Sequence, residues 1–122
     1  MARVLFKKTG KLFNFCLQST AIVANKNERE RLFFGKLGEE IGLLFQLSDD
    51  LLDVSGSKKL VGKSIKKDKK KGKSTLINYM GYVKTLKFAE KLKKKILLNL
   101  KKHGKNAKDL NETIEFIQKR NF

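Results

Sequence analysis

Three aspartates stand close together in an otherwise basic sequence, at the end of the segment 45–53. On a helix Asp49 and Asp53 are one turn apart, so their Cβ atoms lie about 5–6 Å from each other, and Asp50 lies one step round. Gln46 precedes Asp49 and Asp50 by one turn. Carboxylates near a helix C-terminus repel one another and oppose the helix dipole, which suggests a compensating cation. Mg²⁺ suits such a position because it takes a few carboxylate oxygens and shares its shell with phosphates; a solvated helix end without function is the alternative.

Lysines with glycine nearby flank this acidic segment on both sides, and those that follow it form glycine–lysine pairs. Lys8-Thr9-Gly10 precedes it among apolar residues, and Gly62-Lys63 and Gly72-Lys73 follow it. Glycine lets the backbone approach a phosphate closely, and lysine supplies a compact positive charge. A P-loop is excluded because its glycine–lysine spacing is missing and no strand precedes these pairs. The pattern therefore indicates carboxylate, Mg²⁺, diphosphate and lysine acting together.

The elements that must position these residues are predicted to be helices. Proline is absent, β-branched runs are few, and Leu, Lys, Phe and Glu are abundant. We expect helices over residues 4–24, 28–53, 74–81, 82–102 and 107–119, with Asn27 as an N-cap and a Gly- and Lys-rich connection over 55–73. The first helix is apolar around most of its circumference, which predicts burial in a larger bundle with Cys16 in the core. The inward stripe of the second helix is Phe33, Leu37, Ile41, Leu44, Ser48 and Leu52.

Composition narrows the classes of protein. The chain has 122 residues and a formal net charge of +17, with 29 Lys+Arg against 12 Asp+Glu. One cysteine excludes a disulfide scaffold, and no apolar run reaches the roughly 18–20 residues that span a bilayer, so we expect a cytoplasmic location. Lysines cluster over residues 58–73 and 84–108, which a solvated surface or polyanion binding would explain. Only four cations are arginine and no nucleic-acid-binding motif appears, so we expect no specific nucleic-acid partner.

The ordered motifs resemble the C-terminal half of trans-isoprenyl diphosphate synthases, the polyprenyl synthetase family. The resemblance is closest to bacterial farnesyl diphosphate synthase (geranyltranstransferase). It is carried by Lys8-Thr9-Gly10, by Gly42 and Phe45-Gln46 before Asp49-Asp50-x-Leu52-Asp53, and by the lysine-rich segment after them. That later segment contains Gly62-Lys63, Asp68 and Gly72-Lys73-Ser74-Thr75, and the ending 117–121 is also similar.

The resemblance implies an all-α isoprenoid synthase fold and the condensation of an allylic diphosphate (dimethylallyl or geranyl) with isopentenyl diphosphate. It implies that the second aspartate-rich motif holds Mg²⁺ and that lysines bind the allylic diphosphate. Thr9 and Gln46 would line the reacting centre, and Lys8 and Asp49 would also be catalytic. The implied metal ligands are Asp49, Asp50 and Asp53, and the implied diphosphate ligands are Lys8, Lys63 and Lys73.

The first aspartate-rich motif of that family has no counterpart in this chain. Before Asp49 the only acids are glutamates at 28, 30, 39 and 40, and they form no D-D-x-x-D pattern. We therefore expect residues 1–122 to be a partial, C-terminal synthase domain that is inactive alone and associates with itself or with a complementary N-terminal half. Leu12, Phe13, Phe15 and Ile22 would then lack partners. The alternatives are a basic non-enzymatic binding protein and a non-catalytic subunit of a full-length synthase.

Overall fold

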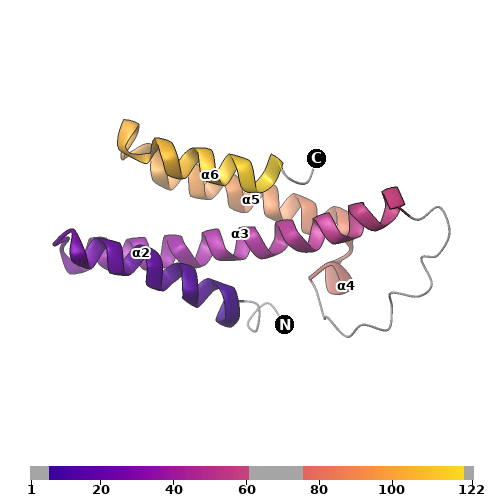
Figure 1. The fold of residues 1–122 in the computed structure, drawn as a ribbon, viewed down its shortest axis with the longest axis horizontal. Coiled ribbons are helices and arrows are strands. Elements are labelled where there is room, and N and C mark those ends of the chain that lie inside the picture. Colours follow the sequence, from indigo (N-terminus) through magenta and orange to yellow (C-terminus); the bar gives the residue numbers. More distant parts are fainter. Residues whose placement is uncertain (1–5, 61–75, 120–122) are drawn as a thin grey trace.

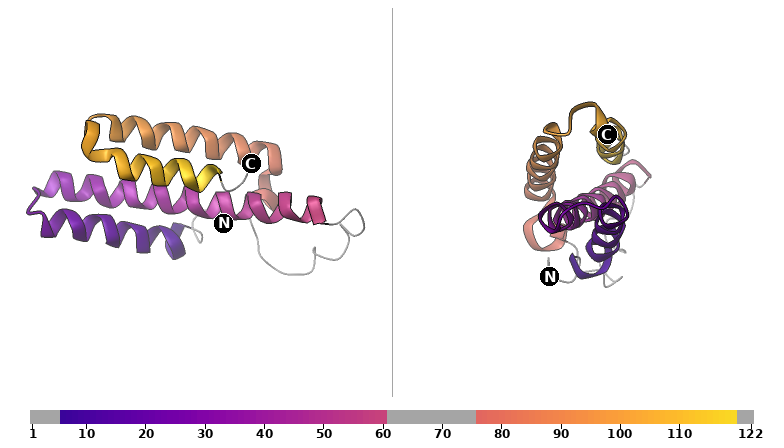
Figure 2. Two further views of the ribbon diagram at one scale, coloured as in Figure 1. Left: turned by 45° about the horizontal axis from the view of Figure 1, so that its top comes forward. Right: turned by 90° about the vertical axis from the view of Figure 1, so that its left-hand side faces the viewer.

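The computed structural model describes residues 6–60 and 76–119, and all regular structure within these ranges is helical. The expected all-α fold is confirmed. The elements are η1 (Phe6–Gly10), α2 (Lys11–Val23), α3 (Glu28–Leu60), α4 (Leu76–Met80), α5 (Tyr82–Lys101), η3 (Gly104–Ala107) and α6 (Lys108–Lys119). The long helix α3 runs through the middle, with α2 on one side and α5 and α6 on the other (Figure 1, and end-on in Figure 2).

The start of α3 agrees with the sequence prediction, but its end does not. The backbone N–H of Glu30 donates to Asn27 Oδ1 at 2.9 Å, which makes Asn27 the expected N-cap. The helix continues past Asp53 and through Gly56 to Leu60, because an isolated glycine weakens a helix without breaking it. The three aspartates therefore lie inside the helix. The helix dipole acts on charges within the last turn only, so it does not destabilise these three carboxylates. They still repel one another.

The core lies between α3 and the pair α5 and α6. Leu37, Ile41, Leu44 and Ser48 are buried as predicted. The prediction that Leu52 continues the stripe is wrong: Leu51 is buried and Leu52 is partly exposed. A helix has 3.6 residues per turn, so a buried row alternates steps of four and three, and after the step of four to Ser48 the next buried residue is Leu51. The core is completed by Leu76, Ala89, Leu92, Ile96, Leu100, Ile114 and Ile117.

Two ion pairs join the helices around this core. Lys95 Nζ of α5 donates to Glu40 Oε1 of α3 at 2.5 Å, and Glu40 is only 7% exposed. Lys93 Nζ of α5 donates to Glu115 Oε2 of α6 at 2.7 Å. Two lysines of α5 that are two residues apart thus bind different helices, Lys93 binding α6 and Lys95 binding α3.

One face of α2 is left apolar and uncovered by the described residues. Leu12, Phe15 and Ile22 are 61%, 68% and 49% exposed. Phe13 is an exception to the expectation, because it packs against Phe45 with ring centroids 5.8 Å apart. The prediction of Cys16 as a core residue is wrong, since it is exposed on the same face as Phe15. The apolar residues of α2 surround most of the helix, but no described helix covers the face of Leu12, Phe15 and Ile22.

Candidate functional site

The Lys8-Thr9-Gly10 segment lies in η1, a π-helical turn that leads into α2. Such turns are rare and occur often at functional sites, because the extra residue redirects side chains. Thr9 Oγ1 donates to Gln46 Oε1 of α3 at 3.3 Å. Two segments that are far apart in the sequence, and that were both predicted to line a reacting centre, are therefore in contact.

Gln46 connects this turn to the aspartates. Its side-chain Nε2 donates to Asp50 Oδ1 at 3.2 Å, while its Oε1 accepts from Thr9. One amide thus uses both ends, and this fixes its orientation: the oxygen faces η1 and the nitrogen faces the acid. Asp50 is 7% exposed, so its link to Gln46 forms in a largely water-excluded place where hydrogen bonds are stronger.

Asp49 and Asp53 lie on the same face of α3 as Gln46, at steps of three and four residues. Asp49 is partly exposed and Asp53 is exposed. Within residues 6–60 and 76–119 no three acidic, His or Cys side chains come together as a cage for a metal ion. A pair of carboxylates one turn apart instead fits a cation that draws its remaining ligands from phosphate and water.

A row of glycines on α3 brings η1 to this position. Gly35, Gly38 and Gly42 precede Gln46 on one face of the helix. A Cβ atom on Gly38 would lie 2.4 Å from the Phe13 carbonyl oxygen, and one on Gly42 would lie 3.0 Å from Gly10 Cα. The α2 backbone therefore rests directly on the α3 backbone along this row. Sequence analysis missed this role, although small residues at i, i+3 and i+7 are a readable signal of close helix packing.

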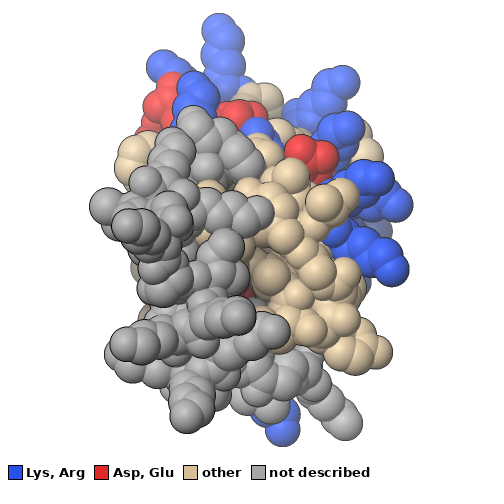
Figure 3. Space-filling model, turned by 90° about the vertical axis from the view of Figure 1, so that its right-hand side faces the viewer, with Lys and Arg blue, Asp and Glu red and all other residues tan. Residues whose placement is uncertain are grey.

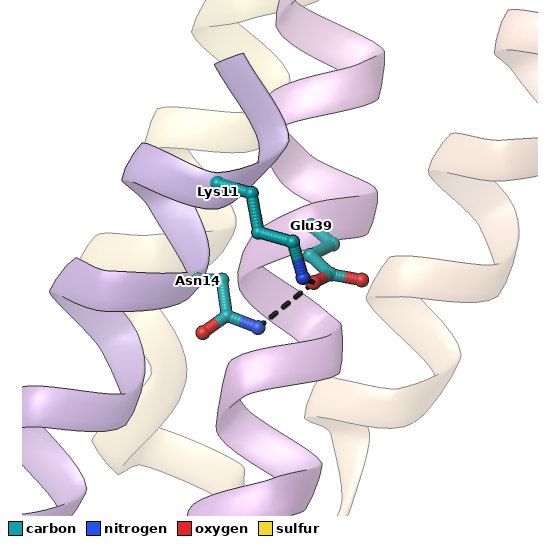
Figure 4. Close-up of polar contacts among 3 residues, drawn as sticks. All are labelled: Lys11, Asn14 and Glu39. Atoms are coloured by element: carbon teal, nitrogen blue, oxygen red, sulfur yellow. Dashed lines mark hydrogen bonds and ion pairs between the residues drawn. The ribbon is translucent and has the colours of Figure 1, made fainter. Parts of the chain in front are cut away.

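Polar contacts fix the register of α2 on this row. Glu39 Oε1 accepts hydrogen bonds from Lys11 Nζ at 2.8 Å and from Asn14 Nδ2 at 2.9 Å (Figure 4). Both donors come from the first turn of α2, directly after η1. Glu39 thereby anchors the end of α2 that carries Thr9.

Some predicted site residues cannot be placed. Lys63, Lys73 and Asp68 lie outside the described residues, and of Lys8 only the backbone position in η1 is described. The structure thus brings together Thr9, Gln46 and Asp50 and puts Asp49 and Asp53 on the same face of α3 as Gln46. A cavity of about 360 Å³ lies elsewhere, between the start of α3 and the end of α5, and includes none of these residues.

Comparison with known proteins gives a consistent result. The polyprenyl synthetase family model matches residues 2–117. A short chain isoprenyl diphosphate synthase of Methanocaldococcus jannaschii is 38% identical over 92% of this chain and 33% of its own length. A farnesyl diphosphate synthase of Micrococcus luteus is 35% identical over 66% of this chain and 28% of its own length. A geranylgeranyl diphosphate synthase of Cyanophora paradoxa is 33% identical over 93% of this chain and 38% of its own length.

The chain spans about a third of the length of these curated relatives. No solved structure gives a significant match.

Proposed function

Because this chain belongs to the polyprenyl synthetase family, we propose that residues 1–122 form the C-terminal part of a prenyl diphosphate synthase domain. Its role is to bind the diphosphate of an allylic substrate, dimethylallyl or geranyl diphosphate, and to support its condensation with isopentenyl diphosphate. The basic, non-enzymatic alternative is not favoured, because it gives no reason for the family match or for the Thr9–Gln46–Asp50 contacts.

The observation that carries the proposal is the hydrogen-bonded series from Thr9 through Gln46 to Asp50. Prenyl transfer by these synthases begins with loss of diphosphate and leaves a positive charge on the allylic carbons. The Thr9 hydroxyl and the Gln46 amide oxygen bring the negative ends of two dipoles to one place, and their mutual hydrogen bond holds them there before substrate arrives. Such preorganised dipoles stabilise a developing charge without the cost of reorienting water.

The carboxylates are assigned by exposure and by position on α3. Asp49 and Asp53 would hold Mg²⁺, since they share a face one turn apart and are the more accessible pair. Asp50 belongs to the same motif, and its buried carboxylate also holds the Gln46 amide in place. When bound, Mg²⁺ would neutralise charge on the departing diphosphate. Lys8, Lys63 and Lys73 remain the proposed lysine ligands of the same diphosphate.

The uncovered face of α2 indicates that this part of the domain needs a complement. We assign Leu12, Phe15 and Ile22 to contact with the N-terminal part of a synthase domain, on the same chain or a separate one. A second copy of this chain is less suited, because each copy has a net charge of +17. The chain alone is therefore expected to bind diphosphate with Mg²⁺ but not to turn over substrate.

Thermal unfolding of the 122-residue chain, followed by circular dichroism, tests the diphosphate site. We expect inorganic diphosphate with Mg²⁺ to raise the melting temperature, and either one alone to have little effect. Asp49→Asn should abolish this protection, whereas Asp109→Asn, which removes an exposed acid of α6, should leave it intact. Equal protection of both variants would contradict the assignment of the site.

A second measurement tests the incomplete domain. Geranyl and isopentenyl diphosphates are incubated with the chain alone and with the N-terminal part of a full-length relative added. Product formation is expected only in the mixture, and it should be lost with Asp49→Asn. Turnover by the purified chain alone would refute the proposed division of the site.

A further inference from the structure

Five lysines form a single row along the outward face of α5. Lys84, Lys87, Lys91, Lys94 and Lys101 recur at steps of three or four residues, with Leu98 in the one gap, and all five are exposed. We call them the lysine ridge. The opposite side of the same helix is buried in the core and consists of Thr85, Ala89, Leu92, Ile96 and Leu100. The apolar face of α5 is therefore not free to enter a membrane, and only the charged face can meet a partner.

The ridge is not neutralised within the described part of the chain. Ion pairs of α5 there are made by Lys93 and Lys95, which point sideways to α6 and α3, and no ridge lysine has a carboxylate within 4.0 Å. The helix carries one acid of its own, Glu90. Like charges three or four residues apart weaken a helix, so an anionic surface beside the ridge would relieve a repulsion that the fold leaves in place.

The shape of the ridge suits an extended, flat partner. From Lys84 to Lys101 it runs about 25 Å along a straight helix, at 1.5 Å per residue. Two exposed apolar side chains accompany the lysines. Val83 stands just before Lys84 and is 62% exposed, and Leu98 stands between Lys94 and Lys101 and is 70% exposed. In Figure 3 most of the visible Lys and Arg side chains stand at the upper and right-hand edges, with a few Asp and Glu among the upper ones, and they border a tan surface of other residues.

The ridge and the apolar face of α2 can be occupied at the same time. The helices α2 and α5 lie on opposite sides of α3 in each view of the fold (Figures 1 and 2). A partner that contacts the uncovered face of α2 therefore meets the side of α3 opposite to the outward face of α5.

We propose that the lysine ridge docks this protein on the surface of a bilayer that contains anionic lipids. Each lysine near such a surface strengthens attachment about fivefold, and a planar array of head groups offers an anion to every position along the row. Val83 and Leu98 would contact the boundary between head groups and acyl chains. Within the described residues no helix is long and apolar enough to cross a membrane, so this attachment is peripheral.

Nucleic acid fits the same row less well. The ridge contains lysine only, without the arginine forks that pair with phosphate and guanine edges. Among the residues of α5, Phe88 is the one aromatic side chain that borders it, at 40% exposure, whereas single-strand binding uses successive stacking platforms. Exposed Leu98, between Lys94 and Lys101, has no role on a phosphate backbone. The proposal rests on α5 alone and is independent of the diphosphate site.

Sedimentation of the full chain with vesicles tests the docking surface. We expect binding to vesicles of phosphatidylcholine with about a third phosphatidylserine, loss of most binding at high salt, and little binding to phosphatidylcholine alone. The triple variant Lys87→Gln/Lys91→Gln/Lys94→Gln should bind anionic vesicles about 100-fold more weakly. Far-ultraviolet circular dichroism should show that this variant remains folded, because the three side chains are exposed.

A matched variant distinguishes the effect of the lysine ridge on vesicle binding from the effect of net charge. Lys7→Gln/Lys26→Gln/Lys119→Gln removes the same three charges from exposed positions outside α5 and should bind within a few-fold of the unmodified chain. Leu98→Gln should weaken vesicle binding without changing binding to duplex DNA. An equal loss of vesicle binding in the two triple variants would overturn the proposal that the lysine ridge is the docking surface. Tighter binding to DNA than to anionic vesicles, lost only in the ridge variant, would assign the surface to nucleic acid instead.

Discussion

Gly38 of α3 lies directly against the backbone of Phe13 of α2: a Cβ atom on Gly38 would lie 2.4 Å from the Phe13 carbonyl oxygen. Backbone atoms cannot rotate aside as a side chain can. This contact sets the path of α2 along α3, and η1 therefore ends where Thr9 reaches Gln46.

Gly38→Ala is expected to destabilise the chain by about 2 kcal/mol, because overpacking against backbone outweighs the gain in helix propensity. Gly35→Ala is the matched control. Its Cβ would meet only the ends of the Asn14 and Gln18 side chains, at 3.2 Å, so near-neutral stability is expected. Urea unfolding measures both. A similar loss at the two positions would show that helix contact is not the cause.

Lys95→Met should cost about 1–2 kcal/mol, since it leaves the buried Glu40 carboxylate without its partner, with a discount for the half-exposed lysine. Lys108→Met is the comparison, because its ion pair with Glu112 is long at 3.8 Å and both side chains are exposed. That change should be close to neutral. Glu40→Gln combined with Lys95→Met should recover part of the loss, and a double variant no more stable than Lys95→Met would contradict this explanation.

Gln46→Glu should place a second carboxylate beside Asp50 and end the donation from the amide nitrogen. Repulsion requires both groups to be ionised, so the loss of stability should be largest near neutral pH. It should shrink as the pH falls toward about 4, because two adjacent carboxylates favour uptake of a proton in the folded state and so raise the pKa of the pair. Unfolding free energies at several pH values measure this effect. Gln46→Met, which removes the donor without adding a charge, should show a loss that varies less with pH.

Phe15→Ser should leave the stability of the isolated chain almost unchanged, because the ring is 68% exposed. It should instead weaken association with an N-terminal synthase part, measured by analytical ultracentrifugation. Ile96→Ser is the contrasting change, since this side chain is fully buried and its loss should unfold much of the chain. Normal association of the Phe15 variant would remove the α2 face from the proposed interface.

The sequence by itself determined the helical class, the N-cap at Asn27 and most of the core stripe of α3. These depend on local propensity and on a 3.6-residue period, both of which are present in a single segment. The motif order also led to the polyprenyl synthetase family, which the family match confirms. The assignments of Lys63, Lys73 and Asp68 stay predictions, because they lie outside the described residues.

The tertiary structure decided what no single segment could. The fate of an apolar side chain depends on whether another helix lies over it, so Cys16 is exposed while Phe13 of the same helix packs on Phe45. The extension of α3 to Leu60 places the aspartates within a helix, because one glycine is too weak a signal to end it. The contact of Thr9 with Gln46 exists only because a row of glycines lets two backbones touch, and that is a property of a pair of helices rather than of either one.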